Sequence, residues 1–387
     1  MQCNQAQINQ QIADFEWLHA HPELPYQEFE TTAYIRQSLA EMGVEVLPYG
    51  MKTGLVAQLT GTKSCPAGAT PIVSLRADID ALPVQEECDL SYRSQNEGKM
   101  HACGHDFHAA VLLCVARLLK ANIDQFCGTV RFMFQPAEEA SMGAADVLCT
   151  PAMEGVGAVF ALHTSPLYPA GVIGLREGAV TASVNRFEIN LTGVGCHAAY
   201  PENSVDVIVM GASIVSALQS VVSRNVAPLS PALLSITHFE AGKTWNVLPK
   251  TAYLEGTVRT LSKADQTLIP QRMRALIEGI AQSYGGSAEF LWHQGPPATD
   301  NDPAWTAFAG QIAQEQGLEV ALDPPSMLGE DFSCYQELAK GVYIHAGIGL
   351  TEPNHHPKFM VDEASLAPAA DYFATLTAAA LAKLAAE

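Results

Sequence analysis

Strand patterns alternate with helix patterns along most of the chain, and this alternation constrains the fold more than any other feature. Short β-rich runs are predicted at residues 54–60, 71–78, 129–134 and 158–163. Helical patterns are predicted at residues 8–21, 28–42 and 105–120. Strands that alternate with helices form a largely parallel sheet with helices on both faces, and ligands gather beyond the carboxyl ends of its strands.

The alternation is interrupted in the second half of the chain by a different pattern. Strands are predicted at residues 185–192, 233–239, 252–259 and 287–293, with helices at 204–223 and 263–284. This β-α-β-β-α-β order is that of a ferredoxin-like unit. The first pattern then resumes with a helix at 303–316, a strand at 341–346 and an Ala-rich helix at 363–386.

We therefore predict an α/β fold in two domains, as expected for 387 residues, which exceed what one hydrophobic core usually serves. A discontinuous catalytic domain, residues 1–181 and 296–387, has a mainly parallel central sheet flanked by helices. The ferredoxin-like domain, residues 182–295, is inserted into it. Gly295, Pro296 and Pro297 mark the return to the first domain.

The composition excludes several classes of partner and compartment. A formal net charge of −20 repels phosphate backbones and anionic lipid surfaces, so we expect neither nucleic acid nor membrane as a partner. The nine cysteines show no regular framework spacing and are expected to be mostly free thiols. The first ten residues lack the pattern of a signal peptide, and no apolar run is long enough to cross a bilayer. We expect a cytoplasmic protein.

The motif HACGHDFH, residues 101–108, is the densest polar cluster, and it directly precedes an apolar helix. Cys103 and His105 offer a thiolate and an imidazole, both good ligands for zinc or another divalent transition metal. The alternative is a helix-capping histidine beside a core cysteine. Two ligands alone do not define a metal site.

The motif FQPAEE, residues 134–139, places Glu138 and Glu139 after a predicted strand. In a metal-dependent hydrolase, one such carboxylate holds the ion while the other takes a proton from the water that the ion activates. The alternative is an ordinary helix N-terminus, where acidic residues favour the positive end of the helix dipole.

Further polar residues follow other predicted strands. Asp78 and Asp80 come just after a buried strand, where they need a metal ion, histidines or Arg76 as partners. His163 ends the next strand, and a lone histidine there is more often a core residue than a ligand. The motif NHHPKF presents His355 beside a second histidine near the C-terminus. Because these residues all follow strands of one sheet, they can converge on one site.

The ordered motifs resemble those of one family across nearly the whole chain: the dinuclear metal amidohydrolases that include hippurate hydrolase, bacterial N-acyl-amino-acid amidohydrolases and plant auxin-conjugate hydrolases. The broader group contains aminoacylases and glutamate carboxypeptidases. The motifs are RADIDALP, HACGHDFH, FQPAEE, GVGCHAAYP, NVLP, GEDFS and HHPKF.

The resemblance implies two divalent metal ions per subunit, zinc or manganese first and nickel or cobalt as alternatives. It implies five metal ligands, namely Cys103, His105, Glu139, His163 and His355. Glu138 would be the general base, and Asp80 would orient a ligand. The doubled histidine leaves open whether His355 or His356 is the ligand. The substrate would be a small N-acyl amino acid.

The resemblance also assigns roles to the inserted domain. His197 would reach the active site of the partner subunit and polarise the scissile carbonyl, which implies a homodimer formed through this domain. Asn246 and Arg259 would hold the substrate, with the arginine gripping its carboxylate. Many relatives have glycine before this histidine, whereas here the residue is Cys196.

Two rival hypotheses use the same residues differently. In the first, Cys103 is a nucleophile activated by His105, giving a thiol hydrolase that needs no metal. In the second, the chain is a ligand-binding or assembly protein that kept the fold and lost activity. The complete set of ligands and base argues against the second hypothesis, and loss of activity with a chelator would exclude the first.

Overall fold

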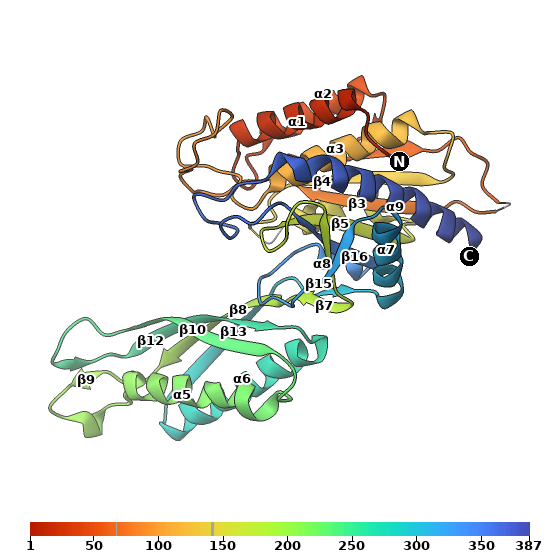
Figure 1. Cartoon of the computed structure of the whole chain (residues 1–387). Coiled ribbons are helices and arrows are strands. Elements are labelled where there is room, and N and C mark those ends of the chain that lie inside the picture. Colours follow the sequence, from red (N-terminus) through yellow and green to blue (C-terminus); the bar gives the residue numbers. More distant parts are fainter. Residues whose placement is uncertain (67, 141–142) are drawn as a thin grey trace. The chain divides into compact units, whose positions relative to one another are not determined.

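The computed structural model describes residues 1–66, 68–140 and 143–387, which form two compact units. Unit 1 comprises Met1–Val180, Asp300–Pro324 and Asp331–Glu387. Unit 2 comprises Thr181–Thr299 and Pro325–Glu330. Each unit has a hydrophobic core of its own, and Figure 1 labels its helices and strands.

Unit 1 is built on an eight-stranded sheet in the order β1-β2-β4-β3-β5-β16-β6-β15. The strands are β1 (Glu45–Val46), β2 (Leu55–Thr60), β3 (Ile72–Asp78), β4 (Thr129–Gln135), β5 (Ala158–Ser165), β6 (Val172–Leu175), β15 (Glu319–Leu322) and β16 (Gly341–Gly347). The four central strands β4, β3, β5 and β16 are mutually parallel, whereas β2 and β6 pair with them in antiparallel fashion. The prediction of a mainly parallel sheet is confirmed.

Helices cover both faces of this sheet (Figure 1). One face packs against α1 (Gln5–Ala20), α2 (Phe29–Glu41), α3 (His105–Ala121), α7 (Pro303–Glu315) and α9 (Leu366–Ala386), and the other against α4 (Gly143–Leu148) and α8 (Ser333–Gln336). Successive residues of β5 explain this layering, because Phe160 and Leu162 belong to one core cluster and Val159 and Ala161 to the other. A strand buried on both faces is apolar at nearly every position, as in AVFAL at residues 158–162 of β5.

Unit 2 has the element order and the sheet of a ferredoxin-like unit. Its elements are β8 (Ser183–Thr192), α5 (Val207–Asn225), β10 (Ala232–Ala241), β12 (Thr251–Thr260), α6 (Lys263–Ser283) and β13 (Ser287–Gln294). The four strands form an antiparallel sheet in the order β10-β12-β8-β13. The short strands β9 (Cys196–His197) and β11 (Val247–Leu248) form a separate two-stranded ladder in this unit. The strands β7 (Gly178–Thr181) and β14 (Thr299–Asn301), which belong mostly to unit 1, form another.

The structure corrects two details of the prediction. The helix expected from residue 204 begins at Val207, because the Asp206 carboxylate caps it by accepting hydrogen bonds from the backbone N–H groups of Ile208 and Val209. Strands β6 and β15 were not predicted. Each has only four residues, too few to display a clear alternation of apolar and polar side chains.

Candidate active site

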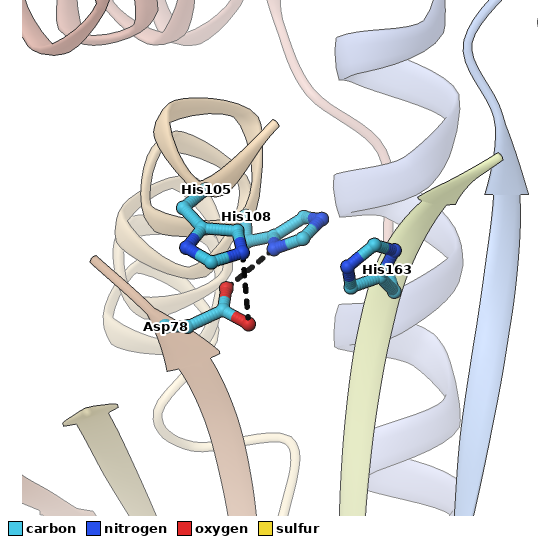
Figure 2. Close-up of side chains that lie close together, drawn as sticks. All are labelled: Asp78, His105, His108 and His163. Atoms are coloured by element: carbon cyan, nitrogen blue, oxygen red, sulfur yellow. Dashed lines mark hydrogen bonds and ion pairs between the residues drawn. The ribbon is translucent and has the colours of Figure 1, made fainter. Parts of the chain in front are cut away.

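Polar side chains from five segments of unit 1 converge beyond the carboxyl ends of its central strands. Asp78 ends β3, His163 lies near the end of β5, and His105 begins α3. Glu138 and Glu139 follow β4, and Cys103 and His355 lie in loops. Figure 2 shows His105 and His108 on α3 close to Asp78, with His163 on the neighbouring strand.

His108 and Asp78 form a buried hydrogen-bonded pair. The backbone N–H of Thr164 donates to His108 Nε2 at 2.8 Å, so this nitrogen carries a lone pair and the proton resides on Nδ1. Nδ1–H then donates to Asp78 Oδ1 at 2.5 Å. Because both of its nitrogens are engaged, His108 does not ligate a metal here, although it lies among the potential ligands.

His163 has its tautomer fixed in the opposite sense. Its Nδ1–H donates to the backbone carbonyl of Thr164 at 2.8 Å, which leaves a lone pair on Nε2. That nitrogen lies 3.7 Å from the sulfur of Cys103. Nε2 of His163 is therefore available to bind a metal ion, and it faces the sulfur of Cys103, another potential ligand.

Asp80 organises the loop that carries the two glutamates. Its carboxylate oxygens accept one hydrogen bond each from the backbone N–H groups of Glu138 and Glu139, both at 3.0 Å. Asp80 Oδ1 also lies 3.3 Å from His105 Nδ1. A single buried carboxylate therefore fixes the backbone of two candidate residues and faces a third.

Within unit 1, three overlapping groups of the described side chains offer ligand atoms that lie within 4.8 Å of one another. They are Asp78, His105, His108 and His163; Cys103, Glu139 and His355; and His105, Glu138 and Glu139. Because His105 and Glu139 each belong to two groups, the potential ligands form one continuous cluster. Of the doubled histidines, His355 joins it, with Nε2 at 3.2 Å from Glu139 Oε1, whereas His356 Nδ1 accepts a hydrogen bond from the backbone N–H of Lys358.

The buried contacts of this cluster suit divalent cations. Both ring nitrogens of His105 are buried without a well-formed hydrogen bond, and they face carboxylates, with Nδ1 at 3.3 Å from Asp80 and Nε2 at 3.5 Å from Asp78. Buried carboxylates that gather in this way need cations, either protons or metal ions, to balance their charge. Thiolate, imidazole and carboxylate are the ligands of zinc and similar transition metals. The residues present therefore suit a metal ion.

The electrostatics of the cluster also favour cations. Burial raises the pKa of Asp78, but the positive charges of Arg76 and His105, together with the hydrogen bond that His108 donates, outweigh it and hold that pKa well below its ordinary value. Hydrogen bonds with Cys103 and Glu139 raise the pKa of His355 to about 10. Protons on histidine thus balance the negative charge, and metal ions that replace them would release those protons.

The residues predicted for substrate binding lie in unit 2. His197 in β9 pairs with Val247 in β11, and the N–H of Ala198 donates to the carbonyl of Asn246 at 3.0 Å, so His197 and Asn246 are neighbours. The N–H of Ala199 donates to His197 Nδ1 at 3.1 Å, which leaves the proton of the neutral ring on Nε2. Arg259 in β12 donates to the carbonyl of Met327 at 2.9 Å.

The structure adds two supporting residues to those named from the sequence. His108 lies one helical turn after His105 in the same motif, and this spacing places both on one face of α3. No motif or spacing in the sequence pointed to Glu28. Its buried carboxylate accepts a hydrogen bond from the N–H of Ala137 at 2.8 Å, and Ala137 adopts a positive φ of 53° immediately before Glu138.

The model of peptidase family M20/M25/M40 matches residues 74–379. The N-acetylcysteine deacetylase of Bacillus subtilis is 46% identical over 360 residues, which cover 93% of each chain. The N-acyl-L-amino acid amidohydrolase of Geobacillus stearothermophilus is 40% identical over 279 residues, covering 72% of this chain and 74% of that protein.

A solved structure described as a dinuclear metal-binding peptidase from the M20 family, from Bacillus subtilis, has the same fold. It superposes with a TM-score of 0.88 at 41% sequence identity, and the match covers 98% of this chain and 99% of the other.

Proposed function

The chain belongs to peptidase family M20/M25/M40, and on this premise we propose how its residues carry out the metal-dependent hydrolysis of N-acyl amino acids. Cys103, His105, Glu139, His163 and His355 hold two divalent ions. The observation that carries this assignment is the continuous cluster of ligand atoms, in which the buried ring of His105 faces the carboxylates of Asp78 and Asp80. Zinc or manganese suits this mixture of sulfur, nitrogen and oxygen ligands best, with nickel or cobalt as alternatives.

When bound there, divalent ions would lower the pKa of a water molecule and polarise the substrate carbonyl. Glu138 accepts the proton of the attacking water and passes it to the departing amine. Asp80 keeps Glu138 in place through its hydrogen bond from the Glu138 N–H. Its second oxygen holds the N–H of Glu139, so the base and the ligand keep a fixed spacing.

The residues of unit 2 bind and polarise the substrate. His197 presents Nε2–H, a hydrogen-bond donor suited to the carbonyl oxygen on which negative charge develops. Arg259 offers a planar cation for the substrate carboxylate, with Asn246 beside it. Unit 1 is thus the catalytic domain and unit 2 the lid and dimerisation domain.

We expect purified enzyme to release free amine from N-acyl amino acids. Among N-acetyl, N-benzoyl and indole-acetyl amino acids, kcat/KM should be highest for the N-acetyl compounds, because the 46% identical relative is named an N-acetylcysteine deacetylase. Amine release followed with a fluorogenic amine reagent measures this. If no member of the panel is hydrolysed by metal-loaded enzyme, the proposal is wrong.

The second subunit attaches along the β10 edge of unit 2. Helix α5 packs over β10 and β12, and its buried residues, Met210, Ile214, Leu218 and Val221, line one stripe. Ile208 and Val209 of α5 and Phe239 of β10 are exposed by 40%, 49% and 39%. An apolar helix beside an edge strand suits a two-fold interface between copies of this chain.

Mixing two inactive variants tests whether His197 serves the partner subunit. Glu138→Gln and His197→Ala each disable one contribution to the site. In a mixed dimer, one site combines the intact Glu138 of one chain with the intact His197 of the other. When the two variants assemble at random in equal amounts, half of the dimers contain one chain of each variant. Each of these dimers has one intact site of its two, so about a quarter of wild-type activity should return.

The two variants must assemble into the same dimers, which co-expression ensures. If a different affinity tag on each chain is used to isolate the mixed dimers, the expected activity rises to about half of wild type. If His197 acted within its own chain, no mixed dimer would have an intact site. Activity that stays at the level of the separate variants would therefore contradict the role in the partner subunit.

The nine cysteines are free thiols in the structure, which supports a reducing compartment such as the cytoplasm.

A further inference from the structure

Thr164, near the end of β5, is hydrogen-bonded to three residues of the active site. Its N–H donates to His108 Nε2 and its carbonyl accepts from His163 Nδ1, both at 2.8 Å. Its hydroxyl donates to the backbone carbonyl of Cys103, also at 2.8 Å. The residue is 2% exposed, so water does not compete for these bonds.

The Thr164 side chain also packs against the turn that delivers two potential ligands. Gly104 lies between Cys103 and His105 and has a φ of +83°, a left-handed conformation that favours glycine. A Cβ atom on Gly104 would lie 2.5 Å from Thr164 Cγ2 and 2.7 Å from Oγ1. The backbone of this turn is therefore pressed against the threonine and hydrogen-bonded to it.

We propose that Thr164 is a positioning residue that fixes Cys103 and His163 relative to each other. The hydroxyl holds the backbone of Cys103, while the carbonyl sets the tautomer of His163, so two ligands distant in sequence share one anchor. This inference rests on the proposed ligand set. Since Thr164 contacts neither ligand atom directly, removing its hydroxyl should lower the affinity for metal without removing a ligand.

Two substitutions of Thr164 separate the effect of its hydroxyl from that of its methyl group, and a third variant serves as a control. Thr164→Val keeps the shape and removes the donor, whereas Thr164→Ser keeps the donor and removes the methyl group. Thr377→Val is a matched control in α9, because Thr377 is fully buried and its hydroxyl donates to the carbonyl of Phe373 at 2.7 Å. Loss of such a supporting bond typically lowers metal affinity by about 10–100-fold.

The measurement is competition between full-length protein and a chelator of known affinity for cobalt, with absorbance recorded in the thiolate-to-cobalt charge-transfer region. Thr164→Val should bind at least one cobalt ion about 10–100-fold more weakly and show a weaker or shifted thiolate band. Thr164→Ser and Thr377→Val should match wild type. Thermal unfolding of the metal-free proteins shows that each variant is folded.

Several results would overturn the proposal. Wild-type affinity and an unchanged band in Thr164→Val would show that the hydroxyl is not needed. An equal loss of cobalt affinity in Thr164→Ser or Thr377→Val would show that the effect comes from packing or from general destabilisation. A wild-type protein that binds cobalt without any thiolate band would instead overturn the assignment of Cys103 as a ligand, on which the proposal rests.

Discussion

Replacing Glu138 with glutamine should lower kcat for N-acyl amino acids by roughly 10²–10⁴-fold, the usual contribution of a general base. Glutamine has nearly the same shape and keeps the backbone N–H that donates to Asp80, so the loop should stay in place. It cannot accept and return a proton. Steady-state kinetics on the best substrate of the panel, at several pH values, measure the loss.

Glu139→Gln is the matched control, because Glu139 is the neighbouring residue and donates its N–H to the same aspartate. Its carboxylate faces His355 at 3.2 Å and belongs to two of the ligand groups. This variant should lose metal, whereas Glu138→Gln should keep the wild-type metal content. Wild-type turnover in a metal-loaded Glu138→Gln protein would contradict the role of Glu138.

Removing the metal ions should abolish hydrolysis and also destabilise unit 1. A ligand that binds only the folded state stabilises it by about 4 kcal/mol when present at a thousand times its dissociation constant. Without metal, the carboxylates of Asp78, Asp80 and Glu139 stay gathered around His105 with protons alone to balance their charge. Dialysis against a chelator should therefore lower both turnover and the melting temperature, and added zinc or manganese should restore both.

The same experiment separates this account from a thiol hydrolase. Cys103 is 9% exposed, and its sulfur accepts a hydrogen bond from Asn354 at 3.4 Å in the ligand cluster. A metal-free enzyme that keeps full activity but is inactivated by iodoacetamide would show that Cys103 acts as a nucleophile. Iodoacetamide should instead react readily only after metal has been removed.

The sequence was most informative where side chains follow strands. Asp78, Glu138 and His163 could be placed at one edge of a sheet because strand periodicity locates strand ends and parallel strands end together. The resemblance to metal-dependent amidohydrolases is confirmed by the family match and by the named relatives. The α/β fold with a mainly parallel sheet is confirmed as well.

The supporting interactions could not be predicted, because they depend on which atom of a side chain meets which backbone group. His108 lies within the metal-binding motif, yet the N–H of Thr164 occupies the nitrogen that could have bound metal. Glu28 reaches Ala137 across 109 positions of sequence. No periodicity or local motif encodes such a contact, so residue roles of this kind emerge only from the three-dimensional arrangement.

The central claim is that five side chains hold two metal ions in unit 1. X-ray diffraction recorded on both sides of the absorption edge of the bound metal locates those ions directly. We predict two anomalous peaks, with Cys103 sulfur at about 2.3 Å and ligating nitrogen and oxygen atoms of His105, Glu139, His163 and His355 at about 2.0–2.2 Å. Peaks bound by other residues, or none near these five in metal-loaded crystals, would contradict the account.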